Sequence, residues 1–145
     1  MRFWDSSALV PLMVDESTSV SVLGEYEDDP EVVVWWSASI ECVSALARRE
    51  RDGELSSASM ARGMMRLDAV AAAWLEILPT ASVRRNAIRL LRVHSLSATD
   101  ALQLAAAIIA AEEHPATLPF TTLDTRLAIA AEREGFHIVS PGARL

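Results

Sequence analysis

Short apolar runs alternate with helix-like patterns along the whole of this 145-residue chain. The run from Val32 to Trp36 is β-branched and aromatic with no polar alternation, which is typical of a strand covered on both faces. Longer segments with apolar residues at helical spacing separate this run from the others. The predicted strands are 2–5, 32–36, 75–79, 118–122 and 136–139, and the predicted helices are 8–14, 17–26, 40–51, 56–73, 81–94, 100–113 and 124–134.

This alternation predicts an α/β fold, with a parallel sheet wrapped by helices on both faces. We find no linker, repeat or low-complexity tract, so residues 1–145 are expected to form a single domain. The longest apolar runs are alanine-rich and too short to span a membrane, and the chain starts without a signal-peptide pattern. The single Cys42 excludes an internal disulfide and indicates a cytoplasmic location.

Four acidic residues lie where a predicted strand gives way to a helix. Asp5 ends the first strand, and Glu41 lies in the first turn of the helix after the second. Asp100 follows Thr99, the expected helix cap, and Asp124 lies just past the fourth strand. Because sites in open parallel sheets form outside the carboxyl ends of the strands, we expect all four carboxylates to project toward one edge.

Each acid alone has a structural explanation, since the helix dipole stabilises a carboxylate in the first turn by roughly 0.3–1 kcal/mol. Four at one edge would repel one another unless a cation were bound between them. Oxygen ligands with open positions for water suit Mg²⁺ or Mn²⁺ better than zinc. The three histidines are dispersed along the chain and are expected to be structural: His94, His114 and His137.

The net charge of −7 argues against broad electrostatic binding of nucleic acids. All 13 basic residues are arginine, so every chemistry that needs a lysine is excluded. A phosphoryl-accepting receiver domain needs such a lysine, and a phosphatase with an aspartyl nucleophile needs a second Asp where Ser7 stands.

Two groups of arginines are candidates for contact with RNA phosphates, and each is equally explained as a solvated or ion-paired surface. One is a stripe at i, i+4 and i+7: Arg85, Arg89 and Arg92. The other ends the helix of Glu41: Arg48, Arg49 and Arg51. Trp35, Trp36 and Trp74 lie in or beside predicted strands, so we expect core positions rather than base stacking.

Four blocks of the chain resemble those of PIN-domain ribonucleases, in particular the VapC-type toxins of bacterial toxin–antitoxin pairs. They span most of the chain in order: Asp-Ser-Ser-Ala-Leu-Val at 5–10, Ile-Glu-Cys-Val-Ser-Ala-Leu-Ala-Arg-Arg at 40–49, Thr-Asp-Ala-Leu-Gln-Leu-Ala at 99–105, and Phe-Thr-Thr-Leu-Asp-Thr-Arg-Leu at 120–127. The resemblance implies a PIN-like three-layer fold with a five-stranded parallel sheet flanked by helices.

The same resemblance implies that Asp5, Glu41, Asp100 and Asp124 form a catalytic acidic quartet that binds Mg²⁺ or Mn²⁺. Asp5 and Asp100 would be the most direct ligands. Glu41 and Asp124 would bind a second ion or hold waters. Two hydroxyl residues would orient carboxylates or waters: Ser6 and Thr122.

The implied activity is metal-dependent hydrolysis of RNA phosphodiester bonds, as the toxin of a toxin–antitoxin pair. The implied partners are the RNA substrate, a cognate antitoxin and a second copy of the chain in a homodimer. Candidate contact surfaces are the Met60–Met64 face and the edge formed by Val10, Leu12 and Val14. The alternatives are a PIN-like RNA-processing nuclease and a non-catalytic scaffold that binds RNA or protein.

Overall fold

The structure is a computed structural model that describes residues 1–142. Every predicted strand and helix is present, with ends that differ by at most a few residues. A short 3₁₀ turn, Pro115–Thr117, is added before the fourth strand. In chain order the elements are β1 (Arg2–Trp4), α1 (Ser6–Met13), α2 (Ser19–Asp28), β2 (Val32–Trp35), α3 (Ala38–Arg51), α4 (Ser57–Ala71), β3 (Leu75–Ile77), α5 (Ala81–Val93), α6 (Ala98–Ala110), β4 (Phe120–Thr121), α7 (Thr125–Arg133) and β5 (Ile138–Val139).

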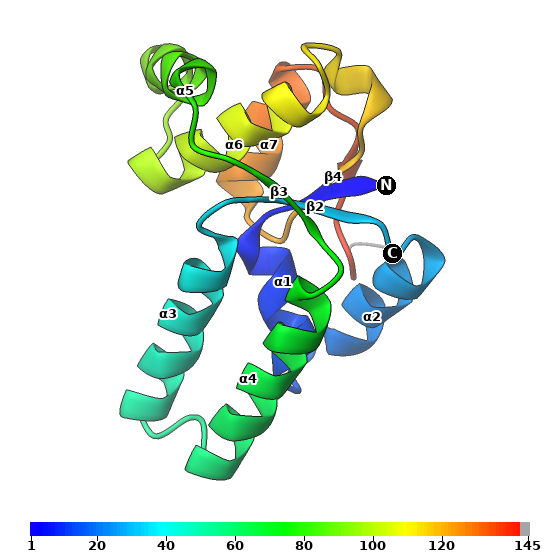
Figure 1. The fold of residues 1–145 in the computed structure, drawn as a ribbon, viewed down its shortest axis with the longest axis vertical. Coiled ribbons are helices and arrows are strands. Elements are labelled where there is room, and N and C mark those ends of the chain that lie inside the picture. Colours follow the sequence, from blue (N-terminus) through cyan, green and yellow to red (C-terminus); the bar gives the residue numbers. More distant parts are fainter. Residues whose placement is uncertain (143–145) are drawn as a thin grey trace.

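The five strands form one sheet in the order β3-β2-β1-β4-β5, and every pairing is parallel. The central strand β1 pairs through Phe3 with Val33 on one side and with Phe120 on the other. Because all strands run in one direction, their carboxyl ends lie at one edge of the sheet (Figure 1).

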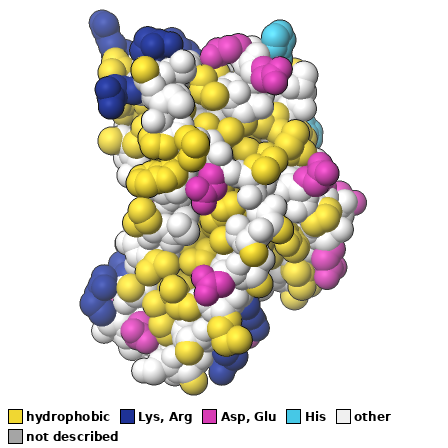
Figure 2. Space-filling model, in the orientation of Figure 1, with side chains coloured by type: hydrophobic (Ala, Val, Ile, Leu, Met, Phe, Trp, Pro, Cys, Tyr) yellow, Lys and Arg dark blue, Asp and Glu magenta, His cyan; other side chains and the backbone are white. Residues whose placement is uncertain are grey.

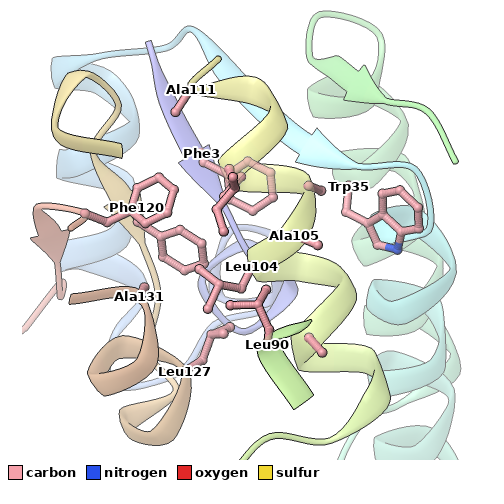
Figure 3. Close-up of a cluster of buried hydrophobic side chains, with 14 of the residues drawn as sticks. Phe3, Trp35, Leu90, Leu104, Ala105, Ala111, Phe120, Leu127 and Ala131 are labelled. Atoms are coloured by element: carbon pink, nitrogen blue, oxygen red, sulfur yellow. The ribbon is translucent and has the colours of Figure 1, made fainter. Parts of the chain in front are cut away.

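Helices cover both faces of the sheet, and the strand residues alternate between the two cores. Phe3, Val33 and Trp35 face α5, α6 and α7 and pack there with Leu104 (Figure 3). Trp4, Val32 and Val34 point the other way, toward the core formed by α1, α2, α3 and α4. The result is a three-layer arrangement, as predicted.

Helix α6 buries most of the residues after its first turn. It contacts α5, α7, β2 and β3, so its alanine-rich run is covered on several sides (Figure 1). This explains why its sequence is apolar around most of the helix rather than along one stripe. None of the helices in residues 1–142 combines the length and the apolar character needed to cross a bilayer.

Two helices beside the predicted acids have caps that the sequence analysis did not name. Asp5 caps α1, and its side chain accepts a hydrogen bond from the Ser7 backbone N–H. Ser97, rather than Thr99, caps α6, because that helix begins two residues earlier than predicted. Several Ser, Thr and Asp residues precede each helix, and all of them are good caps, so the sequence alone does not select one.

The tryptophans also divide differently from the prediction. Trp35 and Trp74 are buried as expected, whereas the side chain of Trp36 is 46% exposed. Trp36 follows the last residue of β2, where neither helical layer covers it. The expectation of a core position was therefore wrong for Trp36.

Candidate active site

The four predicted carboxylates line one cavity of about 480 Å³ at the carboxyl edge of the sheet. They come from the end of β1, from α3, from the first turn of α6 and from the segment between β4 and α7. Besides these acids, the polar lining consists of Ser6, Ser7, Ser44, Thr99, Arg48 and Arg49. The structure thus brings together Asp5, Glu41, Asp100 and Asp124, which lie up to 119 positions apart in the sequence.

Asp5 is the most buried of the four, with 4% of its surface exposed. The Ser7 hydroxyl donates a hydrogen bond to its Oδ1 at 2.9 Å, and the Ser7 backbone N–H donates to its Oδ2 at 3.1 Å. Burial raises the pKa of Asp5 to about 6; hydrogen bonds from Thr122 and Ser7 oppose this rise, and the charge of Asp124 adds to it. The Asp5 carboxyl group therefore titrates nearer to neutral pH than an ordinary aspartate does.

Thr122 links the first and fourth strands at the cavity. Its hydroxyl lies 3.3 Å from the Ser7 hydroxyl and accepts a hydrogen bond from the Asp124 backbone N–H at 3.0 Å. The Leu123 N–H in turn donates to the Ser7 hydroxyl at 2.9 Å. Thr122 is hydrogen-bonded to Asp5, the kind of contact that the resemblance implied for it. The other hydroxyl that contacts Asp5 is that of Ser7 rather than that of Ser6.

Asp124 lies close enough to Asp100 to affect the ionisation of Asp100. Partial burial raises the pKa of Asp100, a hydrogen bond with Ser97 lowers it, and the charge of Asp124 raises it further. Asp124 caps α7 by accepting a hydrogen bond from the Leu127 N–H at 3.0 Å. Asp124 thus acts electrostatically on both Asp5 and Asp100.

Glu41 is held by side chains from three elements. Gln103 of α6 donates to both carboxylate oxygens at 3.1 Å, and the Ser37 hydroxyl donates at 2.8 Å. The Ser6 hydroxyl, a predicted supporting group, lies at the long distance of 3.4 Å from Glu41. These contacts fix the direction in which Glu41 points into the cavity.

Gln103 is a residue of the site that the sequence analysis did not identify. It is 1% exposed, and its own carbonyl oxygen has no hydrogen-bond partner within the described residues. The available signal was a single polar residue inside an otherwise apolar helix, one turn after Asp100. A buried amide in such a helix needs a polar partner, which here is Glu41.

The donor chemistry of the cavity fits a hard divalent cation, because carboxylate and hydroxyl oxygens converge there and no thiol or imidazole lines it. Among residues 1–142, however, no three acidic, histidine or cysteine side chains already surround one point closely enough to form a metal centre. The charge of Asp124 disfavours ionisation of Asp5 and of Asp100, and Glu41 is hydrogen-bonded separately to Ser37 and Gln103. Cation binding therefore requires the carboxylates to close in.

The two groups of arginines lie in different places. Arg48 and Arg49 line the acid cavity, and Arg49 pairs with Glu16 at 2.8 Å. The predicted stripe instead lines a separate shallow hollow of about 500 Å³ on α5: Arg85, Arg89 and Arg92. Figure 2 shows basic side chains gathered over α5 and around the far ends of α3 and α4.

Within the stripe, Arg89 is already committed to an ion pair. It contacts both oxygens of Glu134 at 2.8 and 3.2 Å, and His94 lies 2.6 Å from the same carboxylate. This cluster ties α5 to the end of α7. Part of the predicted RNA-binding stripe thus has a structural partner.

Neither a protein-family model nor a curated protein sequence matches the chain. Solved structures do match it over nearly its whole length. PAE2754 from Pyrobaculum aerophilum is 22% identical with a TM-score of 0.61, covering 95% of this chain and 83% of its own. FitAcB from Neisseria gonorrhoeae is 15% identical with a TM-score of 0.67, covering 99% and 100%. FitAB bound to the IR36 DNA fragment is 15% identical with a TM-score of 0.59, covering 97% and 95%.

At these identities the likeness shows the fold. The chain has the PIN-like α/β fold, with a five-stranded parallel sheet between helical layers, that its four sequence blocks predicted.

Proposed function

We propose that this protein is a divalent-cation-dependent endoribonuclease that acts as the toxin of a toxin–antitoxin pair. The observation that supports it most is the single cavity lined by four carboxylates at the carboxyl edge of a PIN-like sheet. A purely structural role for these acids would not require them to share a cavity.

Asp5 and Asp100 would be the most direct ligands of Mg²⁺ or Mn²⁺, with Glu41 and Asp124 holding a second ion or ordered waters. A cation held there would supply an activated water and would stabilise the leaving oxygen of a phosphodiester. The raised pKa of Asp5 fits this assignment, because a neighbouring positive charge would favour the ionised carboxylate that burial disfavours.

The surrounding polar side chains would keep the acids in place. Ser37 and Gln103 hold Glu41, while Ser7 and Thr122 hold Asp5. In a site of this kind, residues that orient the ligands matter nearly as much as the ligands themselves.

Arg48 is the residue best placed to meet a substrate phosphate, because it lines the same cavity as the acids. Arg85 and Arg92 on α5 would add a weaker, salt-dependent contact outside the cavity. Arg89 would contribute least, since Glu134 already neutralises it. These assignments reconcile RNA binding with an overall charge of −7.

The antitoxin would bind an apolar groove of about 570 Å³ between α1, α2 and α4. The predicted contact edge is only partly available there, since Leu12 lines the groove but Val10 and Val14 are buried. Met60 and Met64 pack against the core and are half-buried. Exposed Val20 and Leu23 are the main accessible apolar side chains of the groove.

The direct test measures cleavage of a single-stranded RNA by the purified protein with Mg²⁺ and with a chelator. We expect Asp5→Asn and Asp100→Asn each to lower cleavage by about a hundredfold or more. Asp68→Asn is the matched control, because Asp68 is an exposed carboxylate on α4. Equal cleavage by all four proteins would contradict the proposal and would assign the cleavage to a contaminant.

The toxin role is tested separately in cells. Expression of the wild-type chain should arrest growth, and Asp100→Asn should not. Relief of the arrest by a small protein encoded next to it would support an antitoxin. Cleavage in vitro without growth arrest would favour an RNA-processing nuclease instead.

A further inference from the structure

One tryptophan of this chain differs from the other three in exposure. Trp4, Trp35 and Trp74 are 0%, 4% and 8% exposed, whereas Trp36 is 46% exposed. The exposed part of an aromatic ring does not stabilise the fold, because hydrophobic stabilisation scales with the apolar area removed from water. Trp36 therefore has a surface available for a ligand.

Trp36 precedes a residue that contacts the acid site. Its backbone N–H donates to the carbonyl of Ile77 at 3.0 Å, which fixes its backbone at the ends of β2 and β3. The next residue along the chain, Ser37, donates its hydroxyl to Glu41 at 2.8 Å. Because consecutive Cα atoms are about 3.8 Å apart, the backbone of Trp36 lies immediately beside a residue that holds one of the four carboxylates.

Two exposed apolar residues flank this position. Leu78 is 59% exposed and follows Ile77, the residue that Trp36 contacts; Ile40 is 60% exposed in the first turn of α3. Figure 2 shows hydrophobic side chains over the region where β2 and β3 end. Exposed apolar side chains thus lie beside Trp36 where β2 and β3 end.

We propose that Trp36 is a base-stacking residue that holds an unpaired base beside the cleaved phosphodiester. This inference rests on the proposed ribonuclease function and names a residue that positions its substrate. A protein with a net charge of −7 gains little affinity for RNA from overall electrostatics. Stacking on an aromatic side chain does not depend on charge and accepts any base. It therefore provides affinity for RNA that the negative net charge of the protein does not provide.

Stacking also selects the form of the substrate. A base within a duplex is already stacked on its neighbours, whereas a base in a loop or single strand is free to lie on the indole. Trp36 would therefore favour single-stranded RNA over duplex RNA of the same composition. It would act on binding rather than on the chemical step.

The test uses the intrinsic fluorescence of the full chain in the Asp100→Asn background without added metal, so that RNA binds but is not cut. Subtracting the spectrum of a Trp36→Phe variant isolates the signal of Trp36. We expect a short single-stranded oligoribonucleotide to quench this signal and a duplex of the same composition to quench it far less.

Kinetics with an otherwise wild-type chain give the second readout. We expect Trp36→Ala to raise KM for single-stranded RNA roughly tenfold or more, with kcat within about twofold. Trp36→Phe should recover most of the loss because it retains an aromatic face. Ile129→Ala is the matched control, because Ile129 on α7 is an apolar side chain with a similar exposure of 47%, and its KM should match that of wild type.

Unchanged KM in Trp36→Ala, or equal quenching by single-stranded and duplex RNA, would overturn the inference while leaving the nuclease assignment standing. Another outcome is that the fluorescence of Trp36 falls as the protein concentration rises without RNA, and that size-exclusion chromatography shows dimers that Trp36→Ala abolishes. That result would also overturn the inference, because the exposed surface of Trp36 would then bind a second copy of the chain. Absence of metal-dependent cleavage in the wild type would instead contradict the proposed function.

Discussion

The acid cavity and the arginine stripe of α5 are both charged surfaces that the sequence predicted, but they arise in different ways. The cavity collects carboxylates from four separate segments, because parallel strands deliver their carboxyl ends to one edge. The stripe lies on a single helix, where spacing alone places Arg85, Arg89 and Arg92 on one side. Bringing distant acids together in one cavity lowers the stability of the fold, whereas a stripe of arginines on a solvent-facing helix does not.

The unfavourable electrostatics of the cavity are seen in the pKa values of its acids. Burial and like charges raise the pKa values of Asp5 and Asp100. On α5, by contrast, Arg89 is stabilised by Glu134, which keeps its pKa raised and its charge fixed. Electrostatic strain at one surface and ion pairing at the other indicate which of the two is a site of chemistry.

The largest expected effect comes from Asp124, the acid that acts on both of its neighbours. Asp124→Asn keeps an N-cap for α7, because Asn and Asp cap equally well, but it removes the charge. We expect RNA cleavage to fall by about a hundredfold or more, while Tm changes by no more than about 2 °C. Stopped-time cleavage assays and thermal melts measure the two quantities, and a large loss of Tm would show that the residue is structural.

A second prediction concerns stability against pH in the metal-free protein. The folded-state pKa of Asp5 is about 6 and its ordinary value is 3.8, so folding favours the protonated form. Its contribution is therefore present below about pH 4 and is lost as pH rises through about 6. We expect Asp5→Asn to be more stable than wild type by about 2–3 kcal/mol at pH 7.5 in chelator, with the difference vanishing near pH 4.

Urea unfolding at both pH values measures this difference. Adding Mg²⁺ at pH 7.5 should stabilise the wild type and leave Asp5→Asn unchanged, because ligand binding to the folded state adds stability. A stability difference between Asp5→Asn and the wild type that does not grow between pH 4 and pH 7.5 would contradict the assignment of Asp5.

Gln103 tests whether the hydrogen bonds that hold Glu41 matter for activity. Gln103→Met keeps the volume of the side chain and removes both bonds to the carboxylate. We expect cleavage to fall roughly tenfold, the range found for residues that orient metal ligands. Leu102→Met on the same helix is the control, and a loss in both variants would point to packing rather than to Glu41.

The arginines give the smallest expected effects. Arg48→Ala should weaken RNA binding several-fold, since its side chain lines the cavity. The double variant Arg85→Ala and Arg92→Ala should weaken it by about twofold and slightly reduce its salt dependence. Fluorescence anisotropy across a salt series compares the two, and a larger effect from the double variant would place the RNA path over α5.

Much of the site could be predicted from two features of the sequence: the alternation of strands with helices, and the positions of acids after strands. Alternation of strands and helices fixed the sheet direction. Asp5 directly follows β1 and Asp124 lies three residues after the end of β4, so their convergence followed from topology. The contact between Gln103 and Glu41 could not be predicted from the sequence. Glu41 lies 62 positions away on another helix, and only the packing of α6 against the sheet brings the two side chains together. Trp36 was misassigned because β2 ends at the buried Trp35, one residue before the end of the apolar run.

The central claim, that these carboxylates together bind a divalent cation, is tested most directly by calorimetric titration of the metal-free protein with Mn²⁺. We predict saturable binding to the wild type, unchanged in Asp68→Asn and abolished or severely weakened in Asp5→Asn and Asp100→Asn. No binding to the folded wild type, or equal binding to all four proteins, would contradict the account.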